Sequence, residues 1–558
     1  MPPIPLSFIR RVFLVTLAAL SGCSEKDDSA AQHSYSPEIT VEDLADRTAI
    51  LASDAFGGRP PSGPMADKTV AYLTEAFKRM GLNPAFEDHY VQNVPLVSIA
   101  ARPDAILQIT SPKLERRYDY GSEMMVWTTR VVKEAGIKDS DLVFVGYGIT
   151  APEYGWDDYA GLDMAGKTAV ILVNDPGFST KDPELFTGNA MTYYGRWTYK
   201  YEEAARQGAD GAIIIHETAP ASYPWSVVEN SWSGPQFDLV RSDENAGRVA
   251  IEGWVQSFVA EEIFADAGLD YQSLKQAAAK PGFKPVPMGL KADVSVQNTL
   301  ERSKTVNVGA VLTGVSHPDE AVVYIAHWDH LGEGPAVEGD IIYNGAADNA
   351  AGVASVLEVA EKMAASPQRP ARSVLFLFVG AEEQGLLGAY HYADNPAFPL
   401  AKTAALINTD VVLPLGEMAD ITVVGRGSSD IEAVLESVTT EQGRRLSAYP
   451  NPEQGFYFRS DHFALAKKGV PALYIDTGTE HVEKGRDFVT KAKADYVANR
   501  YHKPSDEVMT DWDWRGVVLD VEAIYQVGWQ LAQSRDWPQW ADNTPFKAIR
   551  EESADERR

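Results

Sequence analysis

The sequence predicts an α/β fold with a mostly parallel central sheet that carries helices on both faces. Apolar runs that have the length of strands recur from about residue 303 onward, at Val322–Ala326, Ser373–Val379, Thr403–Asn408 and Ala472–Ile475. The clearest helical pattern, Ala350–Ala365, lies between the first two of these runs. Continuous apolar strands that alternate with helices are typical of parallel sheets buried on both faces.

Two helices and several strands are expected before this region. A helical pattern opens at Val41, and a second runs from Met65 to Met80, where Gly81 stops it. The turn-rich loop Ser53–Pro61 lies between them, and residues 90 to about 115 alternate as strands.

Residues 140–290 differ in composition from the rest of the chain. They contain loops rich in tryptophan and tyrosine, two apolar strand patterns and one helical pattern at Tyr199–Gln207. We therefore expect a compact β-rich unit inserted into the α/β domain. The predicted division is a signal peptide at 1–22, a tether at 23–37, the first part of the main domain at 38–135, the inserted unit at 136–295, the rest of the main domain at 296–545 and a polar tail at 546–558.

The composition excludes several classes of protein. Of 558 residues, 45% are hydrophobic and 23% are charged, which is globular composition and disfavours disorder and a multi-span membrane protein. The net charge of −29 repels phosphate backbones, so nucleic acid is not an expected partner. The single cysteine excludes an intramolecular disulfide and a cysteine-based zinc site.

The position of that cysteine predicts export. Arg10 and Arg11 precede the apolar run Val12–Ala19, and small residues then lead to Cys23. The segment Leu20–Cys23 resembles the lipoprotein box of bacteria, in which the cysteine becomes the lipidated first residue. By the same resemblance, the serine that follows favours the outer membrane, so we expect a lipoprotein anchored in outer-membrane lipid and facing the periplasm.

Acidic residues and histidines stand where the predicted strands end. They are His327 and Asp329, then Glu382 and Glu383, then Asp410, with Asp348 before the central helix and His502 after the last long loop. Side chains at the carboxyl ends of parallel strands share one edge of the sheet. Several carboxylates there repel one another unless positive charge lies among them, and carboxylates with two imidazoles suit zinc. An aspartate that bridges would bring in a second ion.

The segments that carry these residues resemble the signature segments of the co-catalytic dizinc aminopeptidases, a family related to glutamate carboxypeptidase II and the transferrin receptor. They are Ala326–Gly332, Gly345–Gly352, Glu382–Gly388, Asn408–Asp410 and Tyr501–His502. The Ser53–Arg59 loop is similar to the family's entry segment, and the unit at 136–295 resembles the protease-associated domain that some members carry. These resemblances imply a zinc exopeptidase-like fold.

The resemblance implies a role for each site residue. His327 and Glu383 would bind one Zn²⁺, and Asp410 and His502 a second. Asp348 would bridge the two ions, and the peptide bond after it would be cis.

Two catalytic roles are implied as well. Glu382 would be the general base, and Asp329 would orient the imidazole of His327. Tyr457 and Arg459 are candidates to stabilise the oxyanion, whereas structural or pocket roles are favoured for His330, Asp461 and His462.

The expected activity is that of a metal-dependent aminopeptidase acting on peptides. The alternatives are a carboxypeptidase similar to glutamate carboxypeptidase II and a non-catalytic binding module of the same fold. The presence of all five implied ligands together with Glu382 favours an enzyme.

Overall fold

The computed structural model describes residues 34–557, and residues 36–558 group into one compact unit. The predicted signal peptide, Cys23 and most of the predicted tether lie outside the described residues. Among the described residues, no helix combines the length and hydropathy that crossing a bilayer requires.

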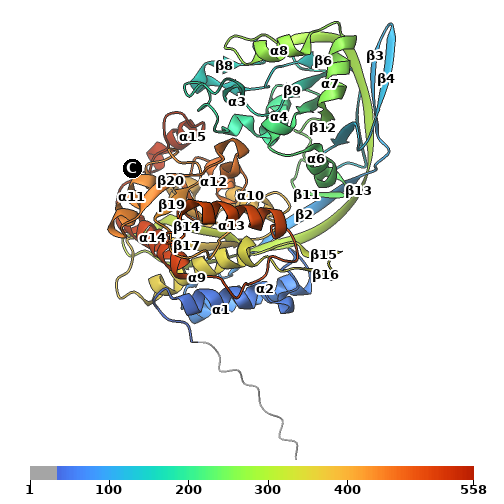
Figure 1. Cartoon of the computed structure of the whole chain (residues 1–558). Helices are drawn as coiled ribbons and strands as arrows, with labels where there is room; N and C mark the ends of the chain where they lie inside the picture. Colours follow the sequence, from blue (N-terminus) through green and yellow to red (C-terminus); the bar gives the residue numbers. More distant parts are fainter. Residues whose placement is uncertain (1–33, 558) are drawn as a thin grey trace, which may run out of the picture. The chain divides into compact units, whose positions relative to one another are not determined.

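A central sheet organises the main domain (Figure 1). Its strands are β1 (Asn83–Pro84), β2 (Val91–Ala101), β13 (Val286–Leu312), β14 (His317–His327), β17 (Arg372–Val379), β18 (Thr403–Thr409), β19 (Asp420–Val423), β20 (Arg445–Ala448) and β21 (Ala472–Asp476). β14 pairs in parallel with β17 on one side and with β18 on the other, and β18 pairs in parallel with β21. β13 and β2 extend the sheet in antiparallel pairings beyond β17. The predicted mostly parallel sheet is confirmed for these four inner strands.

Helices cover both faces of this sheet. They are α1 (Val41–Leu51), α2 (Pro64–Arg79), α9 (Ala351–Ala365), α10 (Leu387–Asp394), α11 (Ile431–Glu441), α12 (His462–Ala466), α13 (Gly485–Asn499), α14 (Arg515–Gln533) and α15 (Phe546–Glu552). Alternate side chains of β14 face opposite ways: Val322 and Tyr324 lie in a core with α1, α9 and α14, whereas Val323 and Ile325 lie in a core with α10 and α12. Both faces of the strand are therefore buried, as its continuous apolar sequence predicts.

The first helices have local and tertiary support. The Thr40 side chain accepts a hydrogen bond from the Asp43 backbone N–H and so caps α1, and Pro64 stands in the first turn of α2. The guanidinium of Arg47 in α1 lies 2.6 Å from the Glu358 carboxylate in α9, and both side chains are fully buried. This ion pair attaches the N-terminal helices to the helix that begins at the predicted metal site.

The inserted unit has its own sheet and helices. Its strands are β3 (Ile106–Ser111), β4 (Leu114–Asp119), β5 (Met124–Trp127), β6 (Glu134–Phe144), β9 (Lys167–Leu172), β10 (Gly211–His216) and β12 (Ile251–Gln256), with a short pair formed by β7 (Thr150–Ala151) and β8 (Trp156–Asp157). Its helices are α3 (Pro176–Thr180), α4 (Trp197–Arg206), α5 (Thr218–Ala221), α6 (Trp225–Trp232), α7 (Ser257–Asp266) and α8 (Tyr271–Ala278). Two strands continue into the main sheet: β13 pairs with β6 as well as with β2, and β11 (Pro235–Leu239) pairs with β2.

Two predicted boundaries differ from the structure. β3 pairs with β13 and β5 pairs with β12, so the inserted unit begins near residue 106 rather than at 136. The range 546–558, expected as a polar tail, contains α15, because Phe546 is buried against Trp540 and Arg550 donates a hydrogen bond to the Thr403 carbonyl.

Candidate metal centre

The predicted site residues meet at the carboxyl edge of the parallel strands. His327 is the last residue of β14, Glu382 and Glu383 follow β17, and Asp410 follows β18. Asp348 lies in the turn before α9, and its peptide bond to Asn349 is cis, as the resemblance implied. His502 comes from the loop after α13.

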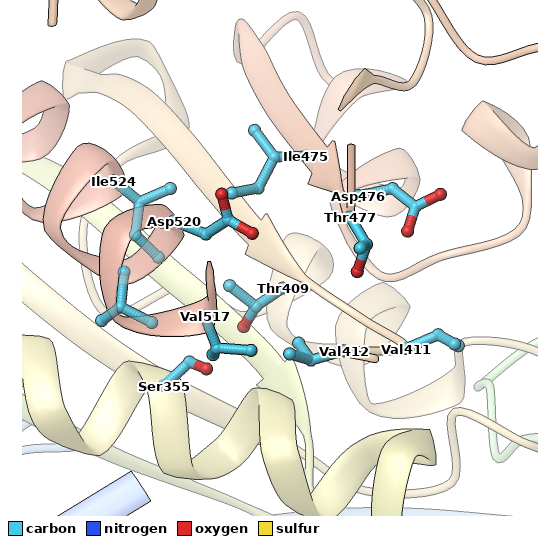
Figure 2. A pocket seen from close by; sticks show the side chains of 11 residues that line it. Ser355, Thr409, Val411, Val412, Ile475, Asp476, Thr477, Val517, Asp520 and Ile524 are labelled. Carbon is cyan, nitrogen blue, oxygen red and sulfur yellow. The ribbon is translucent and has the colours of Figure 1, made fainter. Parts of the chain in front are cut away.

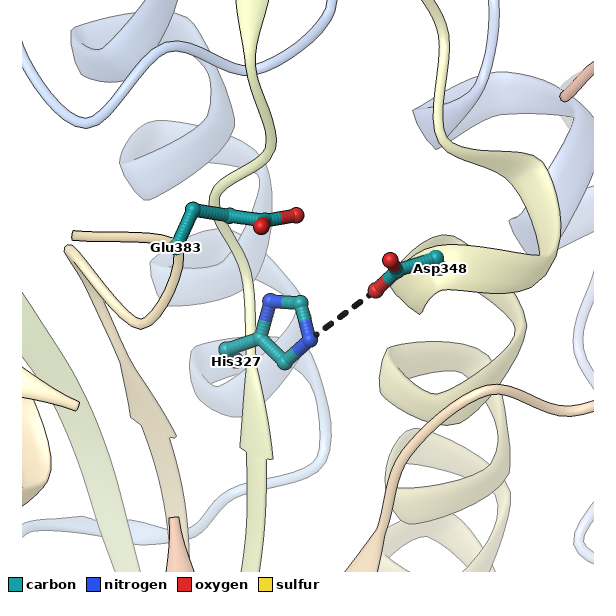
Figure 3. A group of neighbouring side chains, drawn as sticks. All are labelled: His327, Asp348 and Glu383. Atoms are coloured by element: carbon teal, nitrogen blue, oxygen red, sulfur yellow. Dashed lines mark ion pairs between the residues drawn. The ribbon is translucent and has the colours of Figure 1, made fainter. Parts of the chain in front are cut away.

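The carboxylate of Asp348 lies between the two imidazoles. Its Oδ1 is 3.2 Å from Nε2 of His327, and its Oδ2 is 3.3 Å from Nε2 of His502. Figure 3 shows His327 pointing toward Asp348, with Glu383 on the other side of the imidazole. Each oxygen of this one carboxylate thus faces a different histidine, which is the arrangement a bridging ligand needs.

Asp410 and Glu383 each lie beside a different histidine. The resemblance implied Glu383 with His327 and Asp410 with His502, and the shortest contacts are the reverse. Asp410 Oδ1 lies 3.2 Å from His327 Nε2, and Glu383 Oε2 lies 3.2 Å from His502 Nε2. The donor atoms of His327, Asp348 and Glu383 also lie within 4.8 Å of one another, as do those of His327, Glu382 and Asp410. The shortest contacts therefore pair His327 with Asp410 and His502 with Glu383, whereas the resemblance implied that His327 and Glu383 bind one ion.

Asp329 orients His327 through its backbone and not through its carboxylate. The Nδ1 atom of His327 lies 3.0 Å from the Asp329 carbonyl oxygen. The carboxylate instead accepts a hydrogen bond from the Glu382 backbone N–H at 3.2 Å. Asp329 therefore connects the loop after β14 with the loop after β17, and its side chain holds the start of the Glu382–Glu383 segment in place.

The electrostatics of the cluster call for positive charge. Burial raises the pKa of Glu382 well above its usual range, and the neighbouring carboxylates of Glu383, Asp461 and Asp410 raise it further. Burial alone would lower the pKa of His502, but Glu383 and Asp348 outweigh it and raise the pKa to about 10. Without a cation, the cluster thus holds protons on its imidazoles.

Several residues outside the implied ligand set support it. Ser460 Oγ donates to Asp410 Oδ2 at 2.6 Å, and the Asp506 carboxylate accepts hydrogen bonds from the backbone N–H groups of Ala347 and Asp348, each at 3.1 Å. The Nδ1 atom of His330 lies 2.6 Å from Glu383 Oε1. Sequence reasoning did not select Ser460 or Asp506, although each stands within four residues of a residue it did select.

Arg59 in the N-terminal loop holds the backbone around the site. Its buried guanidinium donates to four carbonyl oxygens, those of Leu51, Trp328, Asn344 and Gly345, at distances of 2.6 to 3.0 Å. Of these acceptors, Trp328 follows His327 directly in the sequence, and Asn344 and Gly345 lie shortly before Asp348. The entry loop therefore fixes the two segments that carry the shared carboxylate and one imidazole.

A cavity of about 1070 Å³ opens onto the cluster. Glu382, Glu383 and His502 line it from the main domain, and residues of the inserted unit such as Trp197 and Trp232 line it too. Arg459 lines the same cavity. Tyr457 does not: its ring is buried 4.5 Å from the His462 ring, and its hydroxyl has no partner among the described residues.

A much smaller cavity, about 20 Å³, is lined by Thr409 and Val411, the two sequence neighbours of Asp410 (Figure 2). Its polar lining includes Thr409, Asp476 and Asp520. Both acids are paired, Asp520 with Arg444 at 2.5 Å and Asp476 with Lys493 at 2.8 Å. This space has room for a water molecule and none for a peptide.

Comparison with known proteins identifies the segment that carries this geometry. Residues 307–523 match the model of peptidase family M28, and the match includes all five implied ligands, Asp329 and Glu382. The segment belongs to peptidase family M28. The implied relationship to the zinc aminopeptidases is confirmed for this M28 segment.

Several curated proteins similar to this chain are named as aminopeptidases. Aminopeptidase NAALADL1 of Mus musculus is 31% identical over 169 residues, which are 29% of this chain and 21% of that protein. An aminopeptidase of Pseudomonas aeruginosa is 27% identical over 44% of this chain and 48% of its own length. A probable leucine aminopeptidase 2 of Aspergillus oryzae is 23% identical over 91% of this chain and 88% of its length. The chain therefore spans about a fifth to a half of the first two relatives.

Among solved structures, the aminopeptidase from Aneurinibacillus sp. strain AM-1 is similar with a TM-score of 0.47 and 19% identity, over 88% of this chain and 93% of that chain.

Proposed function

We propose that the chain is a zinc-dependent aminopeptidase that removes N-terminal residues from peptides. One observation carries the proposal: the Asp348 carboxylate presents one oxygen to His327 and the other to His502, and each histidine has a further carboxylate beside it. Two nitrogen–oxygen ligand sets that share one aspartate fit two zinc ions.

The residues divide into two ligand sets. His327 and Asp410 would hold one ion, His502 and Glu383 the other, and Asp348 would serve both. When bound, the ions lower the pKa of water and polarise the scissile carbonyl. The hydrogen bonds that Ser460 and His330 make to Asp410 and Glu383 fix the carboxylates in the orientations that these sets need.

Glu382 is proposed as the general base. It lines the cavity beside the cluster, and burial together with its acidic neighbours raises the pKa of its carboxyl. A carboxylate with a raised pKa accepts a proton from water more readily and can return that proton to the leaving amine. The Glu382 backbone N–H is held by Asp329, which fixes the point from which the side chain extends.

The test is hydrolysis of a panel of aminoacyl chromogenic amides, each beside its N-acetylated form, with and without a chelator. We expect cleavage of the free-amine members only, its loss on chelation and its return with zinc. Cleavage of blocked substrates alone would favour the carboxypeptidase. Binding of zinc without any turnover would favour the binding module of the same fold.

Location and anchoring are proposed from the sequence motif. Cleavage before Cys23, lipidation of its thiol and insertion into the outer membrane would place the enzyme facing the periplasm. A Cys23→Ala variant should then fail to incorporate labelled fatty acid and should leave the membrane fraction. Retention of Cys23→Ala in the membrane fraction would contradict lipid anchoring at this residue.

A further inference from the structure

Basic residues line the large cavity, and most of them are neutralised by acids of the chain. Arg248 lies 2.7 Å from Glu252, Lys467 lies 2.8 Å from Glu202, and Arg241 and Lys468 each lie 3.0 Å from Asp394. His502 contacts the carboxylates of the metal cluster. These cations have partners supplied by the fold.

Among the described residues that line this cavity, Arg196 and Arg459 are the cations without an acidic partner. Neither guanidinium makes an ion pair or a hydrogen bond there, and the Nε atom of each is buried without a partner. Arg196 comes from the inserted unit, directly before α4, and Arg459 comes from the main domain, directly before Ser460. The two domains thus each contribute one unpaired arginine to one space.

The charges of the two arginines act on each other. Burial lowers the pKa of Arg196 to about 9, and the charge of Arg459 adds to the effect. Burial also lowers the pKa of Arg459, which has tyrosines as its electrostatic neighbours, Tyr223, Tyr501 and Tyr449. Both guanidinium groups remain charged at neutral pH, although the protein carries a net charge of −29. Two partly desolvated like charges without an acid cost stability, and an anionic ligand would offset that cost.

We propose that Arg196 and Arg459 form a carboxylate-binding pair that selects peptides bearing a carboxylate near the scissile bond. This inference rests on the proposed function, because it places the pair in the cavity that also holds the metal cluster and Glu382. The planar fork of a guanidinium matches a carboxylate with two parallel hydrogen bonds. A peptide supplies this group either as an Asp or Glu side chain or as its C-terminus, so the substrate is a short or acidic peptide.

Three matched pairs of free-amine substrates distinguish the sources of the carboxylate. Ala-Ala against Ala-Ala amide tests the C-terminus, Ala-Glu-Ala amide against Ala-Gln-Ala amide tests an acid after the scissile bond, and Glu p-nitroanilide against Gln p-nitroanilide tests an acid before it. The measured quantity is the ratio of kcat/KM within each pair, for the full chain loaded with zinc. We expect the carboxylate member to be favoured at least tenfold in one pair.

The variants then assign that preference to the two arginines. Arg196→Gln and Arg459→Gln should each lower the favoured ratio at least fivefold, and Arg459→Lys should keep part of it. A merely structural defect lowers both members of a pair and leaves the ratio unchanged. Arg241→Gln is the matched control, since Arg241 lines the same cavity and is paired with Asp394. Its ratio should stay within twofold of the parent.

Three results would overturn the inference: no preference in any pair, an unchanged ratio in both arginine variants, or an equal loss in Arg241→Gln. If no peptide at all is cleaved, the proposed function fails separately. Titration of the zinc-loaded chain with glutarate then decides, because affinity should fall at least tenfold in Arg196→Gln and Arg459→Gln but not in Arg241→Gln. Equal affinities in all four proteins would overturn the carboxylate pair.

Discussion

The Nε2 atom of His502 lies 3.2 Å from Oε2 of Glu383, and this contact supports the proposed division of the ligands into two sets. Asp410 is left beside His327, with Asp348 between the two pairs. If two ions bind as proposed, mutation of one ligand set should remove one ion and leave the other.

The division predicts which variants lose the same ion. Glu383→Ala and Asp410→Ala should each reduce bound zinc from two ions to one per chain. Adding His502→Ala to Glu383→Ala should remove no further zinc, whereas adding His327→Ala should remove the second ion. Metal analysis after dialysis measures this. Complete loss of zinc from the Glu383→Ala, His502→Ala double variant would contradict the division.

Glu382→Gln tests the general base. The amide cannot take a proton from water, so we expect kcat to fall about 10²- to 10⁴-fold. Zinc content should remain at the parent level, which also settles whether Glu382 is a ligand, since its carboxylate lies near those of the His327 group. The exposed Glu333→Gln is the matched control and should keep full activity. Parent-level kcat in Glu382→Gln would show that another group is the base.

The strand ends could be predicted from the sequence because the period and polarity of each strand are local properties. The lateral order of the strands is not local, and it decides the ligand pairs. β14 pairs with β18 in a register that sets Ile325 opposite Asn408. His327 and Asp410, each two residues further along, therefore reach the same edge of the sheet at the same height. His327 is opposite Val379 on β17, four residues before Glu383. Spacing along the chain carries no information about that difference.

Contacts made by backbone atoms could not be predicted from the sequence either. Asp329 was expected to orient the imidazole of His327, and it contacts that ring through its backbone carbonyl oxygen, which no side-chain pattern indicates. The strand pattern at residues 106–127 is compatible with either sheet, and only its pairing with β12 and β13 assigns it to the inserted unit. The loop containing Arg59 resembled the family's entry segment, but which carbonyls its guanidinium would reach depends on how three distant segments pack.

Arg59→Met should destabilise the protein and weaken zinc binding together. Four carbonyl oxygens lose their donor, and buried unsatisfied acceptors cost about 1–3 kcal/mol each, so we expect the free energy of unfolding to fall by about 3 kcal/mol or more. Arg59→Lys should recover only part, because one ammonium cannot reach all four acceptors. Denaturant unfolding and zinc titration measure the two effects.

The control is Arg79→Met, which breaks an exposed ion pair with Glu361 and should lower the free energy of unfolding by less than about 1 kcal/mol. A cost for Arg59→Met no larger than this control would contradict the role assigned to Arg59.

Asp158 in the inserted unit predicts how stability depends on pH. Burial raises the pKa of its carboxyl to about 7, although the Ile149 backbone N–H and the Trp156 indole N–H donate to it. A carboxyl whose folded pKa is raised contributes stability that is present below the unfolded pKa and is lost as the pH rises through the folded pKa.

Asp158→Asn removes this dependence. Between pH 5 and pH 8, the free energy of unfolding of the parent should therefore fall relative to that of Asp158→Asn by on the order of 2 kcal/mol. Denaturant unfolding of both proteins at pH 5, 6, 7 and 8 measures the difference, and the exposed Asp157→Asn controls for loss of an acid from this loop. Because the unfolded carboxyl is already ionised at pH 5 and the folded one ionises near pH 7, most of the change should fall between pH 5 and pH 7, and it should level off above pH 7. A difference that is constant across the range, or that grows in favour of the parent, would mean that Asp158 is already ionised at pH 5.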